Sequence, residues 1–288
     1  MSHHGSPERA SPERAPHATE RKARISPKAG VSPNVGARST LQVSERGDVV
    51  YLHVAEACPP GKQASDLASQ LSRACADIAQ RADWPAAVVL TAGGDAFWVR
   101  PPESAEDCAP DKVWAAATRA LGSLGPPTIT AIDGDALGLA WDLALACDLR
   151  IATARARVGS PEIKWGCIPS AGATQRLRYT VGPAIATRLL LLGEVVEGPA
   201  ALDLGLVQRL APAGELAAGL EQLLDPLRSA APIALAFLKE AARSGSQMPL
   251  DAGLRLEADL SALLQTTGDR AEGIRAFNER RAPQFKGQ

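Results

Sequence analysis

Two acidic residues, Asp142 and Glu162, are the first candidates for chemistry in this sequence. Asp142 lies in GLAWDLALAC, residues 138–147, which is apolar on every face of a helix and is therefore expected to be buried. Burial raises the pKa of a carboxyl group and makes it a candidate acid or base. The alternative is a structural role, in which Asp142 is a partner of the helix dipole near the first turn. The residues alone leave both interpretations open.

Glu162 lies in VGSPEIKWGCIPSAGATQRL, residues 158–177. Ser160 and Pro161 are typical of a helix N-cap and a first-turn proline, which places Glu162 in a first turn. Taken alone, the stretch is equally typical of an ordinary first-turn acid. A histidine base is disfavoured, because His53 is the one histidine outside the N-terminal tail and it alternates within the predicted strand VVYLHVA.

The elements that must position these acids alternate between strand and helix. A hairpin is predicted from LQVSE and VVYLHVA around the Gly47-Asp48 turn. Apolar spacing then predicts helices over 64–81, 111–124 and 138–147, and strands over 86–91, 128–133 and 148–153. From about Gly172 onward the pattern is mostly helical. We therefore expect an α/β core followed by a helical C-terminal region.

Composition narrows the class of protein. The chain has 288 residues, 45% of them hydrophobic, and a net charge of −1, so nothing points to nucleic acid or to a membrane. Five widely spaced cysteines without a Cys-x-x-Cys pair predict reduced thiols, a cytoplasmic protein and no metal site. Residues 1–38 are rich in Pro, Ser, Arg and Lys and are predicted to be a disordered tail. We predict a core over 39–225 and a C-terminal helical region over 226–288 for oligomerisation and ligand cover.

Several motifs, in order along about residues 40–288, resemble the enoyl-CoA hydratase/isomerase (crotonase) family. TITAIDGDALGLAWDLALACDLRIAT resembles the family signature, and SPEIKWGCIPSAGATQRLRYTVG resembles its second segment. The distance from Asp142 to Glu162 is 162 − 142 = 20 residues, which is the family's spacing between its catalytic acids. The resemblance implies the α/β crotonase (ClpP-like) β-β-α superhelix, with a helical C-terminal region that forms trimers or dimers of trimers.

The resemblance also implies an oxyanion hole for a thioester oxygen, made of two backbone N–H groups. One would be the Leu139 N–H, at the start of the helix that carries Asp142. The other falls on Pro101, within FWVRPP, and a proline has no N–H to donate. Either the loop slips and offers the N–H of Val99 or Arg100, or this half of the hole is lost.

The implied activity is hydration on an acyl-CoA thioester, with Asp142 activating water and Glu162 exchanging a proton with the α-carbon. Dienoyl-CoA isomerases also carry Asp then Glu at these two positions, so an enoyl-CoA or dienoyl-CoA isomerase is an alternative. A catalytically impaired thioester-binding protein is a second alternative, because of Pro101. No cofactor is expected apart from coenzyme A as part of the substrate, although an acyl-carrier protein would present the same arm. The family's CoA contacts map onto Lys62, Phe277 and Lys286, with surface exposure or core packing as simpler explanations.

Overall fold

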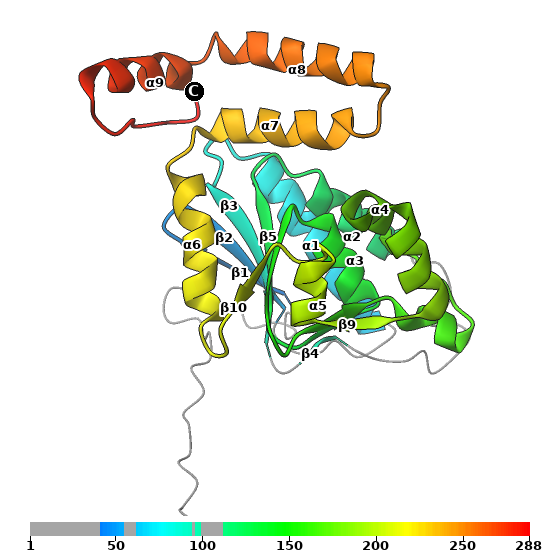
Figure 1. Ribbon diagram of the computed structural model, residues 1–288. Helices are drawn as coiled ribbons and strands as arrows, with labels where there is room; N and C mark the ends of the chain where they lie inside the picture. The colour runs from blue at the N-terminus through cyan, green and yellow to red at the C-terminus, as the bar shows by residue number, and fades with distance from the viewer. Residues whose placement is uncertain (1–40, 55–61, 94–95, 99–111) are drawn as a thin grey trace, which may run out of the picture.

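A six-stranded, mostly parallel sheet forms the centre of the protein (Figure 1). The computed structural model describes residues 41–54, 62–93, 96–98 and 112–288, and for 62–64 and 96–98 it describes the backbone. The predicted tail over 1–38 and the residues Val99, Arg100 and Pro101 lie outside these ranges. The strands of this sheet, in spatial order, are β1 (Leu41–Arg46), β2 (Val49–Val54), β3 (Ala87–Ala92), β5 (Thr128–Ile132), β7 (Leu149–Thr153) and β10 (Arg209–Ala211).

The first two strands form the predicted antiparallel hairpin, and each later neighbour pairs in parallel. Gly47 turns the hairpin with a φ of 61°, in the left-handed region that glycine enters without strain. The β5 and β7 strands are buried along almost their whole length, as parallel strands covered on both faces should be.

A second, smaller sheet is a feature that we did not predict. Its four strands have three residues each, and three of them pair in parallel. They are, in order, β4 (Ala96–Trp98), β6 (Asp135–Leu137), β8 (Arg157–Gly159) and β9 (Val195–Glu197). Two of these strands lead directly to the candidate acids, because β6 ends just before Gly138 and β8 just before Ser160.

Helices cover both faces of the large sheet. One face packs against α1 (Lys62–Ala79), α2 (Lys112–Gly122) and α3 (Leu139–Ala146), and the opposite face packs against α6 (Leu216–Arg228). Alternate strand residues therefore enter two separate cores: Val50 and Leu52 face α1, whereas Val49 and Tyr51 face α6. The α/β core is confirmed.

The remaining helices complete the predicted helical part. They are α4 (Ala173–Leu192), α5 (Gly198–Asp203), α7 (Pro232–Gly245), α8 (Leu250–Leu264) and α9 (Gly268–Glu279). The α4 helix is kinked at Gly182, where φ is 78° and Pro183 follows. Figure 1 shows α8 lying on α7, with α8 and α9 outside the α/β core. The predicted domain limit at 225/226 falls inside α6 and stays a prediction.

Asp148 attaches α7 to the core. Its carboxylate forms an ion pair with Lys239 at 2.7 Å and with Arg243 at 3.4 Å, and it accepts hydrogen bonds from the N–H and hydroxyl of Thr128 at 2.8 Å. Both α7 cations thus meet a carboxylate at the start of β7. The C-terminal helices are anchored by charge as well as by apolar contact.

The prediction of reduced cysteines is wrong for Cys167, which is disulfide-bonded. Cys75 and Cys147 are free and buried. Spacing along a chain does not report which cysteines approach in space, so the absence of a Cys-x-x-Cys pair could not exclude this bond. Among the residues described, no helix has the length and apolar character to cross a membrane, and no cluster of His, Cys, Asp and Glu could hold a metal ion.

Candidate active site

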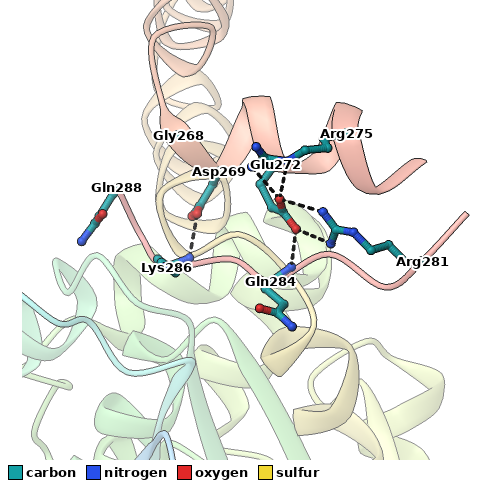
Figure 2. Close-up of a pocket in the computed structure, with 8 residues that line it drawn as sticks. All are labelled: Gly268, Asp269, Glu272, Arg275, Arg281, Gln284, Lys286 and Gln288. Carbon is teal, nitrogen blue, oxygen red and sulfur yellow. Dashed lines mark hydrogen bonds and ion pairs between the residues drawn. The ribbon is translucent and has the colours of Figure 1, made fainter. Parts of the chain in front are cut away.

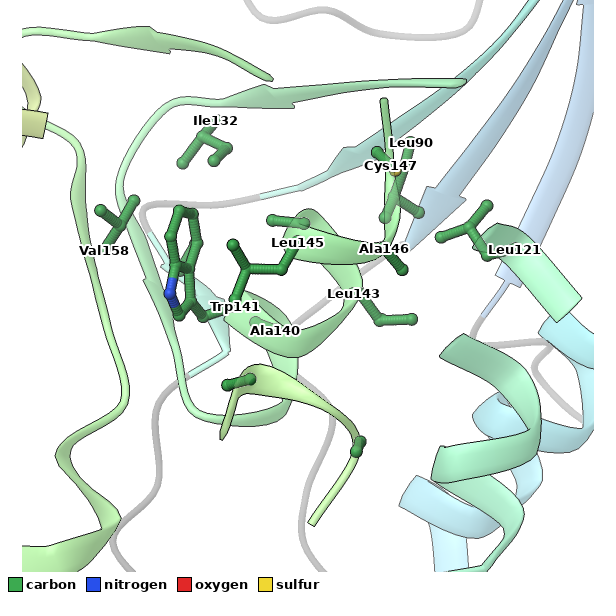
Figure 3. Close-up of a cluster of buried hydrophobic side chains, with 14 of the residues drawn as sticks. Leu90, Leu121, Ile132, Ala140, Trp141, Leu143, Leu145, Ala146, Cys147 and Val158 are labelled. Carbon is green, nitrogen blue, oxygen red and sulfur yellow. The ribbon is translucent and has the colours of Figure 1, made fainter. Parts of the chain in front are cut away.

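The helix α3 carries Asp142 into the interior of the protein. Seven of its eight residues are buried, and the side chain of Trp141 lies between Ile132 and Val158 (Figure 3). The helix is short and apolar all round, so tertiary packing rather than propensity holds it in place. Asp142 is 0% exposed, and its carboxyl group is therefore fixed inside an apolar helix as predicted.

The two oxygens of the Asp142 carboxyl group differ in their surroundings. The backbone N–H of Ala173, the first residue of α4, donates to its Oδ1. Its Oδ2 is buried and has no partner in the described structure. Burial, followed by the charge of Glu162, raises the pKa of Asp142 to about 7, although the Ala173 bond and Arg176 oppose this. Such a pKa suits a group that exchanges protons near neutral pH.

Glu162 lies in a short 3-10 helix, Pro161–Trp165, directly after β8. Ser160 precedes this helix as predicted, but its side chain makes no capping hydrogen bond. The Oε2 of Glu162 is buried without a partner, and burial raises the pKa of this carboxyl as well. A solvated first-turn acid would keep a normal pKa, so the raised pKa of Glu162 supports the interpretation as an acid or base, which stays a prediction.

Gly138 lets Glu162 approach the start of α3. Its φ is 59°, and a Cβ atom placed on it would lie 3.3 Å from the Oε1 of Glu162. Leu139 is the first residue of α3, so its N–H has no carbonyl of the same helix to bond. The N–H and the positive end of the helix dipole converge here. The geometry fits the oxyanion donor predicted at Leu139, whose role remains a prediction.

The arrangement can move protons and hold an anion. Asp142 is buried, Glu162 is partly buried, and the charge of Glu162 raises the pKa of Asp142. Because two such acids do not both ionise at little cost, we expect the pair to carry one proton near neutral pH. Each acid has one oxygen without a hydrogen-bond partner in the part of the chain that the structure describes. An adjacent helix start supplies an unpaired donor. A carbonyl compound bound there could gain or lose a proton next to a stabilised enolate.

Two of the predicted CoA contacts, Phe277 and Lys286, lie in the C-terminal part of the chain that the structure describes. Phe277 is 83% exposed on α9, which rules out its packing in the core of this chain. Lys286 is exposed in the tail, with its backbone N–H bonded to Asp269 at 2.7 Å. Lys62 is the first residue of α1, for which the structure describes the backbone alone. Val99 and Pro101 are not among the residues that the structure describes. Ligand contact by these residues stays a prediction.

A pocket of about 360 Å³ lies between α9 and the C-terminal tail (Figure 2). Its walls include Glu272, which accepts hydrogen bonds from Arg275 and Arg281 and from the N–H of Gln284. Asp269 binds the N–H groups of Lys286 and Gly287 in the same way. Two carboxylates thus hold the tail along α9.

Two residues near Asp142, Gly172 and Ala173, were not predicted from the sequence. The Ala173 N–H reaches Asp142 across 31 residues, and Gly172 before it has a φ of 125°. The run SAGATQ contained the relevant signal, because a glycine before a helix often permits an unusual backbone turn. His53, by contrast, behaves as expected for a strand residue, with its Nδ1 2.9 Å from the Thr91 hydroxyl.

Comparison with known proteins identifies the family. The sequence profile of the enoyl-CoA hydratase/isomerase family matches residues 86–288. The chain belongs to the enoyl-CoA hydratase/isomerase family. It is similar to the enoyl-CoA hydratase of Bacillus anthracis, with a TM-score of 0.77 and 29% identity, covering 86% of this chain and all of that one. The predicted crotonase fold is confirmed.

Curated family members also resemble the chain. It is 40% identical over 168 residues to a 2,3-dehydroadipyl-CoA hydratase of Escherichia coli, which is 58% of this chain and 66% of that protein. It is 40% identical over 161 residues to an (E)-benzylidenesuccinyl-CoA hydratase of Thauera aromatica, which is 56% of this chain and 63% of that protein. These matches span less than two thirds of each of these two relatives.

Proposed function

We propose that this family member is an enoyl-CoA hydratase-like lyase, which adds water across, or removes it from, the α,β double bond of an acyl-CoA thioester. One observation carries the proposal: the charge of Glu162 raises the pKa of the buried Asp142, and each carboxyl group has one buried oxygen without a hydrogen-bond partner among the described residues. The hydratase names of the relatives support the same reaction. Coenzyme A takes part as a portion of the thioester substrate and not as a separate cofactor.

The pKa of Asp142 assigns the shared proton. Burial and the charge of Glu162 raise the pKa of Asp142 to about 7, so we assign the proton of the free enzyme to Asp142. In the dehydration direction Glu162 removes the α-proton, the enolate oxygen accepts the Leu139 N–H, and Asp142 protonates the leaving hydroxyl. The hydration direction starts with the shared proton on Glu162: ionised Asp142 takes a proton from water as the water oxygen bonds to the β-carbon, and Glu162 gives its proton to the α-carbon, which leaves the proton on Asp142. The pair again carries one proton after each turnover.

Loss of absorbance of the conjugated thioester tests this proposal with a panel of enoyl-CoA substrates. The parent protein should consume at least one of them. Glu162→Gln keeps the shape of the side chain but cannot exchange the proton, and should lower the rate by roughly 100-fold or more. Turnover unchanged by Glu162→Gln would refute the proposal. Glu240→Gln, an exposed acid on α7, is the matched control and should turn over like the parent.

An enoyl-CoA or dienoyl-CoA isomerase is the second candidate, since the family includes both activities. The Asp142–Glu162 pair supports it, because moving a double bond needs proton transfer without water. Mass spectrometry separates the two: an isomerase product has the mass of the substrate, and a hydratase product gains one water.

Pro101 motivates a catalytically impaired alternative. Loss of one oxyanion donor costs about 3 kcal/mol, or roughly a hundred- to a thousand-fold in rate. Replacing Arg100, Pro101 and Pro102 together with Gly, Ala and Asp would restore a donor. Activity that appears only in this variant would assign the natural chain to the impaired class, whereas parental activity supports the lyase.

The same proposal includes the cellular compartment, the oligomeric state and the residues that contact coenzyme A. We place the protein in the cytoplasm, as a homotrimer or dimer of trimers, with Lys62, Val99, Phe277 and Lys286 near the CoA portion. Exposed apolar side chains on the C-terminal helices support assembly, namely Leu238, Leu250, Leu254, Leu263, Ile274 and Phe277. Sedimentation of the purified chain measures the oligomer directly, and a monomer at assay concentrations would contradict this part.

A further inference from the structure

The turn that precedes α4 is fastened by two donors that meet on one carbonyl. The hydroxyl of Thr118, on α2, lies 2.8 Å from the oxygen of Ala171, and the Nη1 of Arg176 donates to the same oxygen at 2.8 Å. Thr118 is 0% exposed, so its contact is sheltered from water. Two elements far apart in sequence therefore hold the residue just before Gly172.

Arg176 reaches this carbonyl by folding back over the start of its own helix. Its Nη1 lies 2.0 Å from the point that a Cβ on Gly172 would occupy, so only glycine leaves room for the guanidinium. The Nη2 lies 3.4 Å from the carbonyl oxygen of Thr118. The guanidinium thus bridges α2 and the beginning of α4.

The turn determines where the Ala173 N–H points. Ala173 follows Gly172 directly, and its N–H donates to the Oδ1 of Asp142. A displaced Ala171 carbonyl would rotate the peptide groups that follow it and move this donor. Arg176 also places a positive charge near Asp142, opposite in effect to the negative charge of Glu162. Arg119 and Arg243 are the further cations that act on Arg176 itself.

We propose that Arg176 is a positioning residue for Asp142: it holds the turn so that the Ala173 N–H meets the carboxylate. This inference rests on the proposed function for its catalytic meaning, because an ionisable Asp142 is what allows the pair to give up its shared proton near neutral pH. The contacts themselves do not depend on the reaction.

Carbon-13 NMR of carboxyl-labelled aspartate tests the inference without requiring activity. The Asp142 signal is assigned by its loss in Asp142→Asn, and its titration midpoint is measured in the parent, Arg176→Gln and Arg176→Lys. Arg176→Gln should raise the midpoint by roughly half a pH unit or more, because an opposite charge is lost. Arg176→Lys keeps the charge but cannot contact both the Ala171 and the Thr118 carbonyls, so it should raise the midpoint by less than Arg176→Gln does. Arg178→Gln removes an exposed cation of the same helix, stacked on Tyr179, and should change nothing.

Two results would overturn the inference: an unchanged midpoint in Arg176→Gln, or an equal shift in Arg178→Gln. If Arg176→Gln does not fold, Arg176→Lys decides, and an unchanged midpoint there contradicts the positioning role of the guanidinium. Where the parent hydrates an enoyl-CoA, the alkaline limb of its rate profile should move with the midpoint. A parent without hydratase activity but with the expected NMR shifts would reject the proposed function and leave the positioning role intact.

Discussion

The Oε1 of Glu162 lies 3.3 Å from the position that a Cβ atom on Gly138 would take, so the carboxyl group rests against the start of the helix that carries Asp142. The small sheet creates this relationship, because β6 and β8 are paired neighbours and the N–H of Gly138 donates to the carbonyl of Gly159 at 3.0 Å. One strand pair therefore delivers both acids and the oxyanion donor to the same place.

Gly138→Ala tests this close approach. The new methyl group would press on the Glu162 carboxyl, and a φ of 59° costs a residue with a Cβ roughly 1–2 kcal/mol. We expect a lower melting temperature and a hydration rate reduced at least tenfold. Gly205→Ala is the matched control, with a φ of 76° and nothing within 4 Å of its Cβ. It should lose similar stability and keep its rate, so an equal loss of rate in both variants would speak against a specific contact.

The pKa of Asp142 predicts how stability depends on pH. Its folded value of about 7 is higher than the ordinary value of 3.8, so the folded state binds the proton more tightly. Protonated Asp142 therefore stabilises the folded state fully below pH 3.8, and this stabilisation is lost as the pH rises through the folded pKa of about 7. Denaturant titrations should show the free energy of unfolding falling between about pH 4 and 7. Asp142→Asn should flatten this slope, and an unchanged slope would place the titration elsewhere.

The Lys239–Asp148 ion pair predicts how firmly α7 is attached. The side chains are 11% and 19% exposed, and Lys239→Met leaves part of the Asp148 charge without a partner. We expect a loss of about 2 kcal/mol or more in unfolding free energy and faster amide exchange in α7 and α8. Arg155→Met breaks an exposed pair with Asp133, with side chains 50% and 41% exposed, and should cost under about 1 kcal/mol. Equal effects would contradict the anchoring role of Asp148.

The hydrogen bonds of Glu272 predict that it holds the C-terminal tail against α9. Hydrogen bonds from Arg281, the Gln284 N–H and Arg275 hold the pKa of Glu272 well below its usual range, so it stays ionised at physiological pH. Glu272→Gln removes the charge and should expose residues 282–288 to faster amide exchange and to carboxypeptidase. Glu257→Gln, on the exposed side of α8, is the control. A tail equally protected in both variants would show that Glu272 does not hold it.

Most of the large sheet and its helices could be predicted, because long apolar patterns report burial directly. The helix 138–147 is an example: its residues are apolar on every face, and the structure buries nearly all of them. The small sheet could not be predicted in this way. Strands of three residues, such as Asp135–Leu137, are shorter than one period of any recognisable pattern, and pairing with distant neighbours makes them strands.

The two acids could be proposed from their positions, but not their neighbours. Apolar surroundings marked Asp142, and its spacing from Glu162 followed a family pattern. The donor on Ala173, the Arg176 guanidinium and the Cys167 disulfide depend on how separate segments meet in space. In the sequence, Arg176 is typical of a cation on a surface helix. The structure shows that its guanidinium lies against Gly172 and contacts the Ala171 carbonyl.

The most direct measurement of the central claim is mass spectrometry of a short 2-enoyl-CoA incubated with the protein in heavy-oxygen deuterium oxide. We expect the parent protein to form a product with one heavy oxygen at the β-carbon and one deuterium at the α-carbon. Glu162→Gln should not form this product. Deuterium without heavy oxygen would contradict hydration and assign an isomerase. A substrate returned unlabelled across the whole panel would contradict catalysis by the Asp142–Glu162 pair.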